Sequence, residues 1–433
     1  MPDFGKVLYV AGKELLCGEV TVQGGKVFLS DAAPVLSEHD VRDAMVIVPA
    51  FADVHVHLRE PGFFYKESIA TGTESAARGG FTAVCAMPNL NPVPDSVENL
   101  KKQLEIIKTN AKVLVRPFAA LTVGEKGEKI SDIEGLAPLV VGFSDDGKGV
   151  QSEALMREAM ERVRDAGGII SAHCEVDALL KGGYIHDGAY ARAHGHKGIC
   201  SESEWKMVER DVALAEATGV RYHVCHVSTK ESVEIIRRAK ARGVDVTCET
   251  APHYLTFTDR DARRCGAVMK TYPLIRTAAD RQAVWQGLAD GTLDWVCSDH
   301  APHTCEEKHR SFWDAPAGIS GIEGLSPVLL TAVHRGLLTL PRVAAITSAN
   351  AARTFGLYPR KGVIRPGADA DLAIVDMSTA YTFRQEKMYS KAKWSPYDGM
   401  SFQGRVVETI LRGRTTMRDG QVLPDCFGQF LPV

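Results

Sequence analysis

The 433-residue chain is 45% hydrophobic and 24% charged and has a formal net charge of −3. Its length indicates more than one domain, since domains usually run ~100–200 residues and barrels reach ~250. The composition gives no basic excess for nucleic acid, no run of the ~18 apolar residues that a membrane span needs, and no signal-peptide pattern. Ten scattered cysteines without a paired motif predict reduced thiols and a cytoplasmic protein.

Apolar runs alternate with helical patterns through the middle of the chain. Eight runs have the character of strands: 45–55, 81–88, 112–121, 139–144, 167–173, 220–226, 244–249 and 293–298. The helical segments, several of which begin at Ser, Thr or Asp and end at Gly, are 66–80, 96–110, 152–167, 203–219, 229–243 and 280–291. Strands that alternate with helices predict a parallel sheet, and eight such repeats in about 250 residues favour a closed (β/α)8 barrel.

The two ends of the chain carry short β-type runs separated by Gly and Asp-Gly turns. We therefore expect an α/β protein in which residues 1–48 and 359–433 form one small β domain. The catalytic barrel would occupy residues 49–358.

Histidines and aspartates gather where the predicted barrel strands end. The first strand runs into DVHVHLREPG, in which His55 and His57 are two residues apart and so point to the same side. Further strands end with Asp145, Asp146, His173, His223, His226, Asp299, His300 and His303. Because the active sites of such barrels are built at the carboxyl ends of their strands, this pattern predicts a metal site.

The predicted donors are imidazoles and carboxylates without a thiolate, which suits Zn²⁺, with Co, Mn or Fe as alternatives. Six groups are too many for one four-coordinate zinc and suit two ions. Two ions can share a hydroxide and polarise a carbonyl. Asp299 is placed to carry a proton from the nucleophile to a leaving nitrogen. These features predict hydrolysis of an amide-like bond, or its reverse.

The sequence resembles the amidohydrolase superfamily and, within it, the bacterial type I dihydroorotases. The resemblance is carried by DVHVHLREPGFFYKE, ARGGFTAVCAMPNLNPVPDS, FSDDG, AHCE, HVCHVSTKES and SDHAPHTCEEK. It implies two zinc ions bound by His55, His57, Asp146, His173, His226 and Asp299, with Asp146 as the bridge. Many relatives bridge instead through a carbamylated lysine, for which Lys148 is the alternative; FSDDG favours Asp146.

The reaction implied by the resemblance is the reversible ring closure of N-carbamoyl-L-aspartate to L-dihydroorotate, in pyrimidine biosynthesis. The same resemblance implies that Arg59, Asn89 and His303 contact the substrate carboxylate. A guanidinium suits that role because it can bind a carboxylate through two parallel hydrogen bonds. Glu306 to Lys308, which follow His303, are expected to be solvated.

The chain departs from the type I pattern at two substrate contacts. Tyr272, in KTYPLIR, stands where an Asn is expected to bind the pyrimidine ring, and a phenol lacks the paired donor and acceptor of an amide. Ala317, in DAPAGISG, stands where a bulkier residue is common, although Gly318 is kept. A hydantoinase, dihydropyrimidinase or allantoinase activity therefore stays open as the alternative.

The resemblance also bears on partners. We expect a small-molecule substrate, a homo-oligomer and, as in some relatives, association with aspartate transcarbamoylase. A non-catalytic subunit that scaffolds the transcarbamoylase is disfavoured, because such proteins lose metal ligands that this chain keeps.

Overall fold

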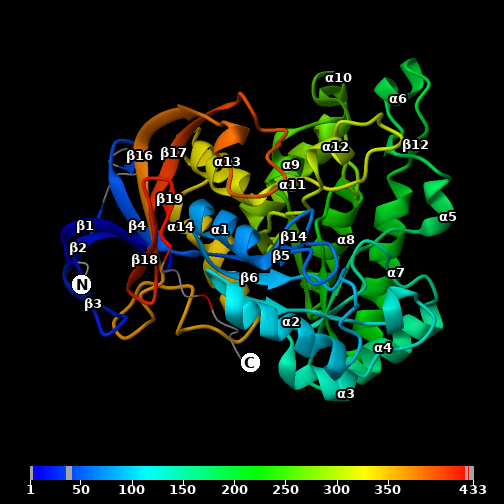
Figure 1. Cartoon of the computed structure of the whole chain (residues 1–433), viewed down its shortest axis with the longest axis horizontal. Coiled ribbons are helices and arrows are strands. Elements are labelled where there is room, and N and C mark those ends of the chain that lie inside the picture. The colour runs from blue at the N-terminus through cyan, green and yellow to red at the C-terminus, as the bar shows by residue number, and fades with distance from the viewer. Residues whose placement is uncertain (1–2, 36–40, 425–427, 429–433) are drawn as a thin grey trace.

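A computed structural model describes residues 3–35, 41–424 and 428 and arranges them as a barrel beside a mixed β-sheet (Figure 1). The barrel strands are β5 (Phe51–Val56), β6 (Phe81–Ala86), β7 (Leu114–Pro117), β8 (Ala119–Ala120), β9 (Phe143–Ser144), β10 (Ile169–Ala172), β13 (Arg221–Val224), β14 (Val246–Thr250) and β15 (Trp295–Val296). All neighbouring pairs are parallel. A parallel bridge from Val56 to His300 joins the last position to the first. β7 and β8 are separated only by Phe118 and count as one barrel position, so the nine strands occupy eight positions. The predicted (β/α)8 barrel is confirmed.

Six of the longer helices overlap the predicted helical segments, and the seventh, at Ile322–His334, lies outside them. The longer ones are α1 (Ile69–Gly79), α2 (Val97–Asn110), α4 (Glu153–Asp165), α7 (Glu202–Thr218), α8 (Lys230–Ala241), α11 (Ala278–Asp290) and α13 (Ile322–His334). Short helices are α3 (Ile133–Leu136), α5 (Asp177–Leu180), α6 (Ala189–Ala193), α9 (Pro252–Thr256), α10 (Ala262–Cys265), α12 (Cys305–Lys308), α14 (Leu340–Ala344) and α15 (Asn350–Thr354). The caps act as the sequence suggests: Ser68 accepts from the backbone N–H of Thr71, and Gly80 ends α1 in the left-handed conformation.

Both termini build the mixed sheet, whose order is β19-β18-β17-β16-β4-β1-β2-β3. Its strands are β1 (Asp3–Ala11), β2 (Glu14–Gln23), β3 (Lys26–Pro34), β4 (Met45–Pro49), β16 (Leu372–Thr382), β17 (Ser401–Leu411), β18 (Arg414–Arg418) and β19 (Gln421–Val422). β1 and β4 pair in parallel and the other neighbours are antiparallel. In Figure 1 the blue and orange-red strands of this sheet lie side by side.

The first predicted strand, 45–55, is wrong as a single element. The chain leaves the terminal sheet after β4 and enters the barrel at β5, with Ala50 between them. The N–H of Ala50 donates to Asp371 O, whereas that of Phe51 donates to Gly80 O. An unbroken apolar run cannot reveal this change of partners, because both strands are buried.

The segment 383–400, between β16 and β17, leaves the terminal sheet and packs at the barrel mouth. Trp394 Nε1 donates a 2.8 Å hydrogen bond to His303 O, and Ser390 Oγ donates to Glu67 at 2.5 Å. A small excursion after strand β10, with β11 (Ile185–His186) paired to β12 (Gly198–Ile199), covers another side. The mouth is therefore shaped by segments from well outside the strand ends.

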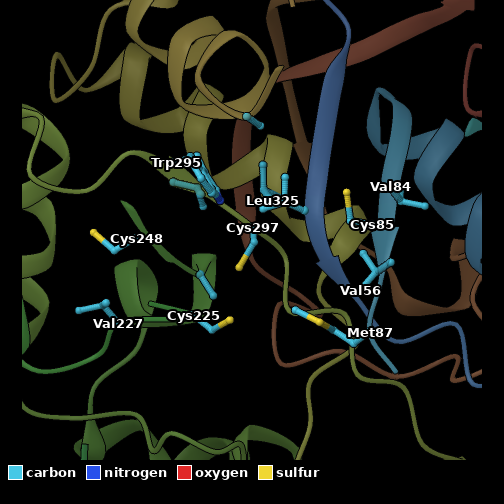
Figure 2. Packing of buried hydrophobic residues seen from close by; sticks show 14 of the residues in the cluster. Val56, Val84, Cys85, Met87, Cys225, Val227, Cys248, Trp295, Cys297 and Leu325 are labelled. Atoms are coloured by element: carbon cyan, nitrogen blue, oxygen red, sulfur yellow. The ribbon is translucent and has the colours of Figure 1, made fainter. Parts of the chain in front are cut away.

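Buried apolar side chains from the barrel strands and from α13 fill the core. Figure 2 shows Val56, Val84, Trp295 and Leu325 among the buried residues of one cluster, to which several cysteines also belong. The nine cysteines that the structure describes are all free. Within the described ranges, no helix is long and apolar enough to cross a membrane.

Candidate metal and substrate site

Two histidines of β5 and the loop after it face two aspartates from other strand ends. His55 Nε2 lies 3.4 Å from Asp146 Oδ1 and 3.6 Å from Asp299 Oδ1. His57 Nε2 lies 3.4 Å from Asp146 Oδ2 and 3.4 Å from Asp299 Oδ1. Most of these distances exceed those of a good hydrogen bond. They match the spacing of about 3.3–3.6 Å between ligands that each lie ~2.0–2.2 Å from one tetrahedral ion.

His173 and His226 approach the same carboxylate from the other side. His226 Nε2 lies 3.4 Å from Asp146 Oδ1 and 3.1 Å from His173 Nδ1. The donor atoms thus form two groups that share Asp146, one with His55 and His57 and one with His173 and His226. His55 Nε2 is buried and has no hydrogen-bond partner, as expected of an atom whose partner is an ion. The residues therefore fit bound metal, with Asp146 common to both groups.

The charges in this group are mutually stabilised. Burial alone would raise the pKa of Asp146, but the imidazoles, His55 first, lower it well below its usual range. Burial likewise opposes ionisation of Asp299, and the hydrogen bond from His57 lowers its pKa. Both carboxylates are therefore ionised and available as oxygen ligands.

Two further carboxylates orient the histidines from behind. His55 Nδ1 lies 2.8 Å from Glu249 Oε1, and His173 Nε2 lies 3.0 Å from Glu175 Oε2. A proton on each of these ring nitrogens leaves the other nitrogen, with its lone pair, facing Asp146. Glu249 is fully buried and also accepts from Trp295 Nε1 at 2.8 Å. Cys225 lies with His55 and Glu249 on this far side of the ring.

The alternative bridging residue, Lys148, lies outside this group. Its side chain is 56% exposed, and its Nζ is 3.9 Å from Glu125 Oε2. Asp145, the first Asp of FSDDG, is buried and accepts from the backbone N–H groups of Leu121 and Thr122. It anchors the loop that presents Asp146.

Three site residues have a left-handed backbone, which is uncommon outside glycine and costs about 1–3 kcal/mol. They are Arg59 (φ 60°), His226 (φ 35°) and Asp299 (φ 44°). Each lies two or three residues after the end of a barrel strand, where the chain turns at the barrel mouth. Such strain is typical of functional positions.

A cavity of about 250 Å³ opens over the metal-binding group. It is lined by His57, Arg59, Asn89, Asp146, Gly147, Lys148, His173, Thr271, Tyr272, Asp299, Ala301, His303, Ala317 and Gly318. All six predicted substrate contacts are in this lining. The structure thus brings the predicted metal ligands and substrate contacts to one place.

Arg59 is the cation best placed for a carboxylate in this cavity. Its Nε donates to Pro302 O at 3.2 Å, and its Nη2 lies 3.4 Å from His303 Nε2. Among the described residues, no carboxylate lies within ion-pair distance of it; the ion pairs nearby are Lys66–Glu307 and Lys148–Glu125. Its guanidinium keeps hydrogen-bonding capacity for a ligand.

His303 and Asn89, predicted to help Arg59, already have protein partners. His303 Nε2 lies 2.8 Å from Ala317 O, and its Nδ1 lies 3.0 Å from Lys66 Nζ. Burial, with the nearby Arg59 charge, lowers the pKa of His303 to about 2, so its ring is neutral. The amide nitrogen of Asn89 donates to Asp146 O at 2.6 Å and to Glu125 at 3.1 Å. Both side chains are held rigidly at the edge of the cavity.

The two residues that depart from the type I pattern also lie here. Tyr272 donates its hydroxyl to Gly183 O at 3.1 Å, so the ring lines the cavity while the hydroxyl points to the excursion after β10. Burial raises its pKa to about 12. Gly318 has φ 138°, and a Cβ there would lie 2.4 Å from Ala301 O, which explains why glycine is kept.

Sequence reasoning left three buried groups without a role. Glu175 and Glu249 end predicted strands, so the rule that found the metal ligands could have found them too. Lys308, expected to be solvated, is fully buried. A charged residue in the polar run TCEEK gives no signal of burial, because that depends on a loop closing around it.

Comparison with known proteins identifies the family. Residues 44–232 match the dihydro-orotase-like family, and residues 276–417 match the amidohydrolase family. The chain is 42% identical to a dihydroorotase from Geobacillus kaustophilus, over 94% of this chain and 96% of that protein. It is 44% identical to a dihydroorotase from Bacillus caldolyticus, over 90% and 91% of the two chains.

Solved structures of similar fold include an L-hydantoinase (dihydropyrimidinase) from Arthrobacter aurescens. It has a TM-score of 0.86 and 26% identity, with 98% of each chain covered. A dihydropyrimidinase from Brevibacillus agri has a TM-score of 0.84 at 22% identity and shares the fold, with 99% of this chain and 97% of that chain covered. The sequence matches and the barrel geometry agree: the chain belongs to the dihydroorotase family of amidohydrolases.

Proposed function

We propose that this protein is a zinc-dependent dihydroorotase that interconverts N-carbamoyl-L-aspartate and L-dihydroorotate in pyrimidine biosynthesis in the cytoplasm. It is a hydrolase of cyclic amides, as its family and its relatives indicate. One observation carries the substrate class: an arginine without a carboxylate partner among the described residues shares a 250 Å³ cavity with the metal-binding group. That pairing suits a cyclic amide bearing a carboxylate.

We assign metal binding to His55, His57, Asp146, His173, His226 and Asp299, with Asp146 shared. When bound, two divalent ions polarise the scissile carbonyl and lower the pKa of the attacking water. The chain's own part is to orient this group, and Glu249 and Glu175 do so by fixing the imidazoles.

In the hydrolytic direction, the oxygen of water adds to the ring carbonyl carbon and the carbon–nitrogen bond breaks. Asp299 accepts the proton of the water and donates it to the departing nitrogen. In the reverse direction, the ureido nitrogen attacks the carboxyl carbon and water leaves. Arg59 binds the other carboxylate through its guanidinium fork, which holds the ring against the metal-binding group.

The test is a panel of substrates offered to the zinc-loaded protein: L-dihydroorotate, dihydrouracil, hydantoin and allantoin. The proposal expects kcat/KM for L-dihydroorotate to exceed the others by about 10² or more, since one buried ion pair is worth ~2–5 kcal/mol. Turnover of only the uncarboxylated rings would overturn the substrate assignment and keep the hydrolase.

A hydantoinase-like activity is the second candidate, and one observation favours it. Tyr272 replaces the Asn expected to bind the pyrimidine ring, and its hydroxyl is already engaged with Gly183 O. The same panel decides between the two, because hydantoin and dihydrouracil lack the carboxylate that Arg59 would bind.

A further inference from the structure

Lys308 is a buried lysine that neither the metal chemistry nor the carboxylate binding uses. It lies at the end of α12, and its side chain has no exposed area. Its Nζ donates to three main-chain carbonyls: Lys270 O at 2.7 Å, Pro316 O at 2.9 Å and Gly318 O at 2.6 Å. The indole ring of Trp394 lies 5.1 Å away. Among the described residues, no carboxylate forms an ion pair with it, so backbone dipoles and a ring face stabilise the charge.

The geometry requires the charged form. A neutral amine has two N–H groups, whereas three carbonyl oxygens lie within 2.9 Å of Nζ. Burial opposes this by lowering the pKa of Lys308, as does the nearby Lys270 ammonium. The free-energy cost of burying the ammonium is lowest when each of its three N–H groups donates to one of these carbonyls.

The three carbonyls belong to two segments that both line the substrate cavity. Lys270 precedes Thr271 and Tyr272, and Gly318 follows Ala317. Gly318 N also donates to Lys270 O at 3.0 Å, so this carbonyl receives two hydrogen bonds. The ammonium therefore joins the 270–272 segment to the loop 302–318 at the point where the two segments meet.

Hydrogen bonds from other residues also hold the 302–318 loop at its start and its middle. Lys270 Nζ donates to Phe312 O at 2.9 Å and to Trp313 O at 3.1 Å. At the start of the loop, Trp394 Nε1 donates to His303 O. Lys308 lies between these ties and contacts the portion of the loop that carries Ala317, whose carbonyl holds the His303 ring.

We propose that Lys308 is a positioning residue for substrate specificity, whose three hydrogen bonds hold the 270–272 and 316–318 segments in register against Arg59 and His303. This inference rests on the proposed function for its substrate and goes beyond it in assigning a role to a residue that touches neither substrate nor metal. Loss of the ammonium would release the 270–272 and 316–318 segments that line the cavity. The metal-binding group, which lies at the ends of the barrel strands, would stay in place.

The experiment is steady-state kinetics with Lys308→Met, which keeps the apolar stem and removes the donors. We expect KM for L-dihydroorotate to rise by about tenfold or more and kcat to fall by less than about threefold, with bound metal unchanged. Lys391→Met is the matched control. Its Nζ also donates to a main-chain carbonyl, Phe64 O at 2.7 Å, and also lies near an aromatic ring, but it is exposed and outside the loop. An unchanged KM in Lys308→Met overturns the inference.

A second variant covers the case in which Lys308→Met does not fold. Lys308→Ala removes the atoms of propylammonium, so this cation is added during purification and assay. Restored KM with propylammonium but not with tetramethylammonium, which has charge and no N–H, supports the hydrogen-bonding role. Equal behaviour with both cations overturns it.

Hydrogen exchange separates this inference from the proposed function. If the wild-type protein does not turn over L-dihydroorotate, the proposed function fails, yet Lys308→Met should still speed amide exchange in peptides covering 302–318 and 270–276. Unaltered exchange in both peptides would overturn the clamp itself, whatever the substrate.

Discussion

The metal-binding group and the substrate wall of the same cavity are built in different ways. The proposed metal ligands lie at or just after the ends of barrel strands, and the parallel hydrogen-bond ladder fixes the positions of those strands. The wall around Tyr272, His303 and Gly318 consists of loops whose backbones are held by buried side chains such as Lys308. We call the proposed metal ligands the strand-built half of the cavity and the loops around Tyr272, His303 and Gly318 the loop-built half. A substitution in the strand-built half should affect one ligand, whereas a substitution in the loop-built half should displace several neighbouring residues.

Asp299→Ala should have the largest effect. The variant loses the group proposed to move the proton, so kcat should fall by about 10²–10⁴-fold, the range of general acid–base catalysis. Most of the metal should remain, because four imidazoles and Asp146 are unchanged. Turnover and metal content are measured on the same preparation; retained turnover would refute the proton role.

Glu249→Gln tests whether the buried carboxylate that contacts His55 Nδ1 raises the metal affinity of the site. Burial would raise the pKa of Glu249, but the neighbouring His223 imidazole, at 3.5 Å, and the hydrogen bond from His55 lower it well below its usual range. A neutral amide is a weaker acceptor for His55 Nδ1, so metal affinity should fall by about 10–100-fold. Competition with a chelator gives the affinity. An affinity equal to that of the wild type would mean that the strand alone orients His55.

The fold was readable from the sequence because each barrel repeat carries local signals. Periodic apolar runs, Ser or Thr N-caps and Gly C-caps are set by neighbouring residues. The helices that follow Ser96, Ser152 and Thr229 begin where those caps predict, whereas the helix predicted at 66–80 begins three residues later, at Ile69. The break at Ala50 was not readable. Whether a buried strand pairs with β1 or with β6 depends on partners far away in the chain.

The contrast between local signals and long-range contacts also explains which site residues could be predicted. His57 and Asp299 could be predicted as cavity residues because strand ends of a parallel barrel converge. The burial of Lys308 could not, since it requires the 302–318 loop, the 270–272 segment and Trp394 to meet. Nor could the engagement of the Tyr272 hydroxyl with Gly183 O, which joins residues 89 positions apart.

Arg59→Lys should have an intermediate effect, confined to substrates with a carboxylate. An ammonium keeps the charge but loses the bidentate fork, so KM for L-dihydroorotate should rise by about tenfold with kcat less affected. KM for hydantoin should stay within about twofold and serves as the internal control. An unaltered KM for L-dihydroorotate would mean that the carboxylate binds elsewhere.

Tyr272→Phe should have the smallest effect, and on stability rather than catalysis. The hydroxyl donates to Gly183 O and so faces away from the ligand, while the ring that lines the cavity is kept. Removing it leaves that carbonyl without this donor and should cost about 1 kcal/mol in the free energy of unfolding, measured by urea denaturation. KM should stay within about twofold. A large rise in KM with unchanged stability would place the hydroxyl on the substrate and make Tyr272 a functional replacement for the expected Asn. If KM is unchanged, we infer that main-chain groups of the loops, and not the Tyr272 hydroxyl, form the hydrogen bonds to the substrate ring. A substitution of the side chain at position 272 would then not remove those hydrogen bonds.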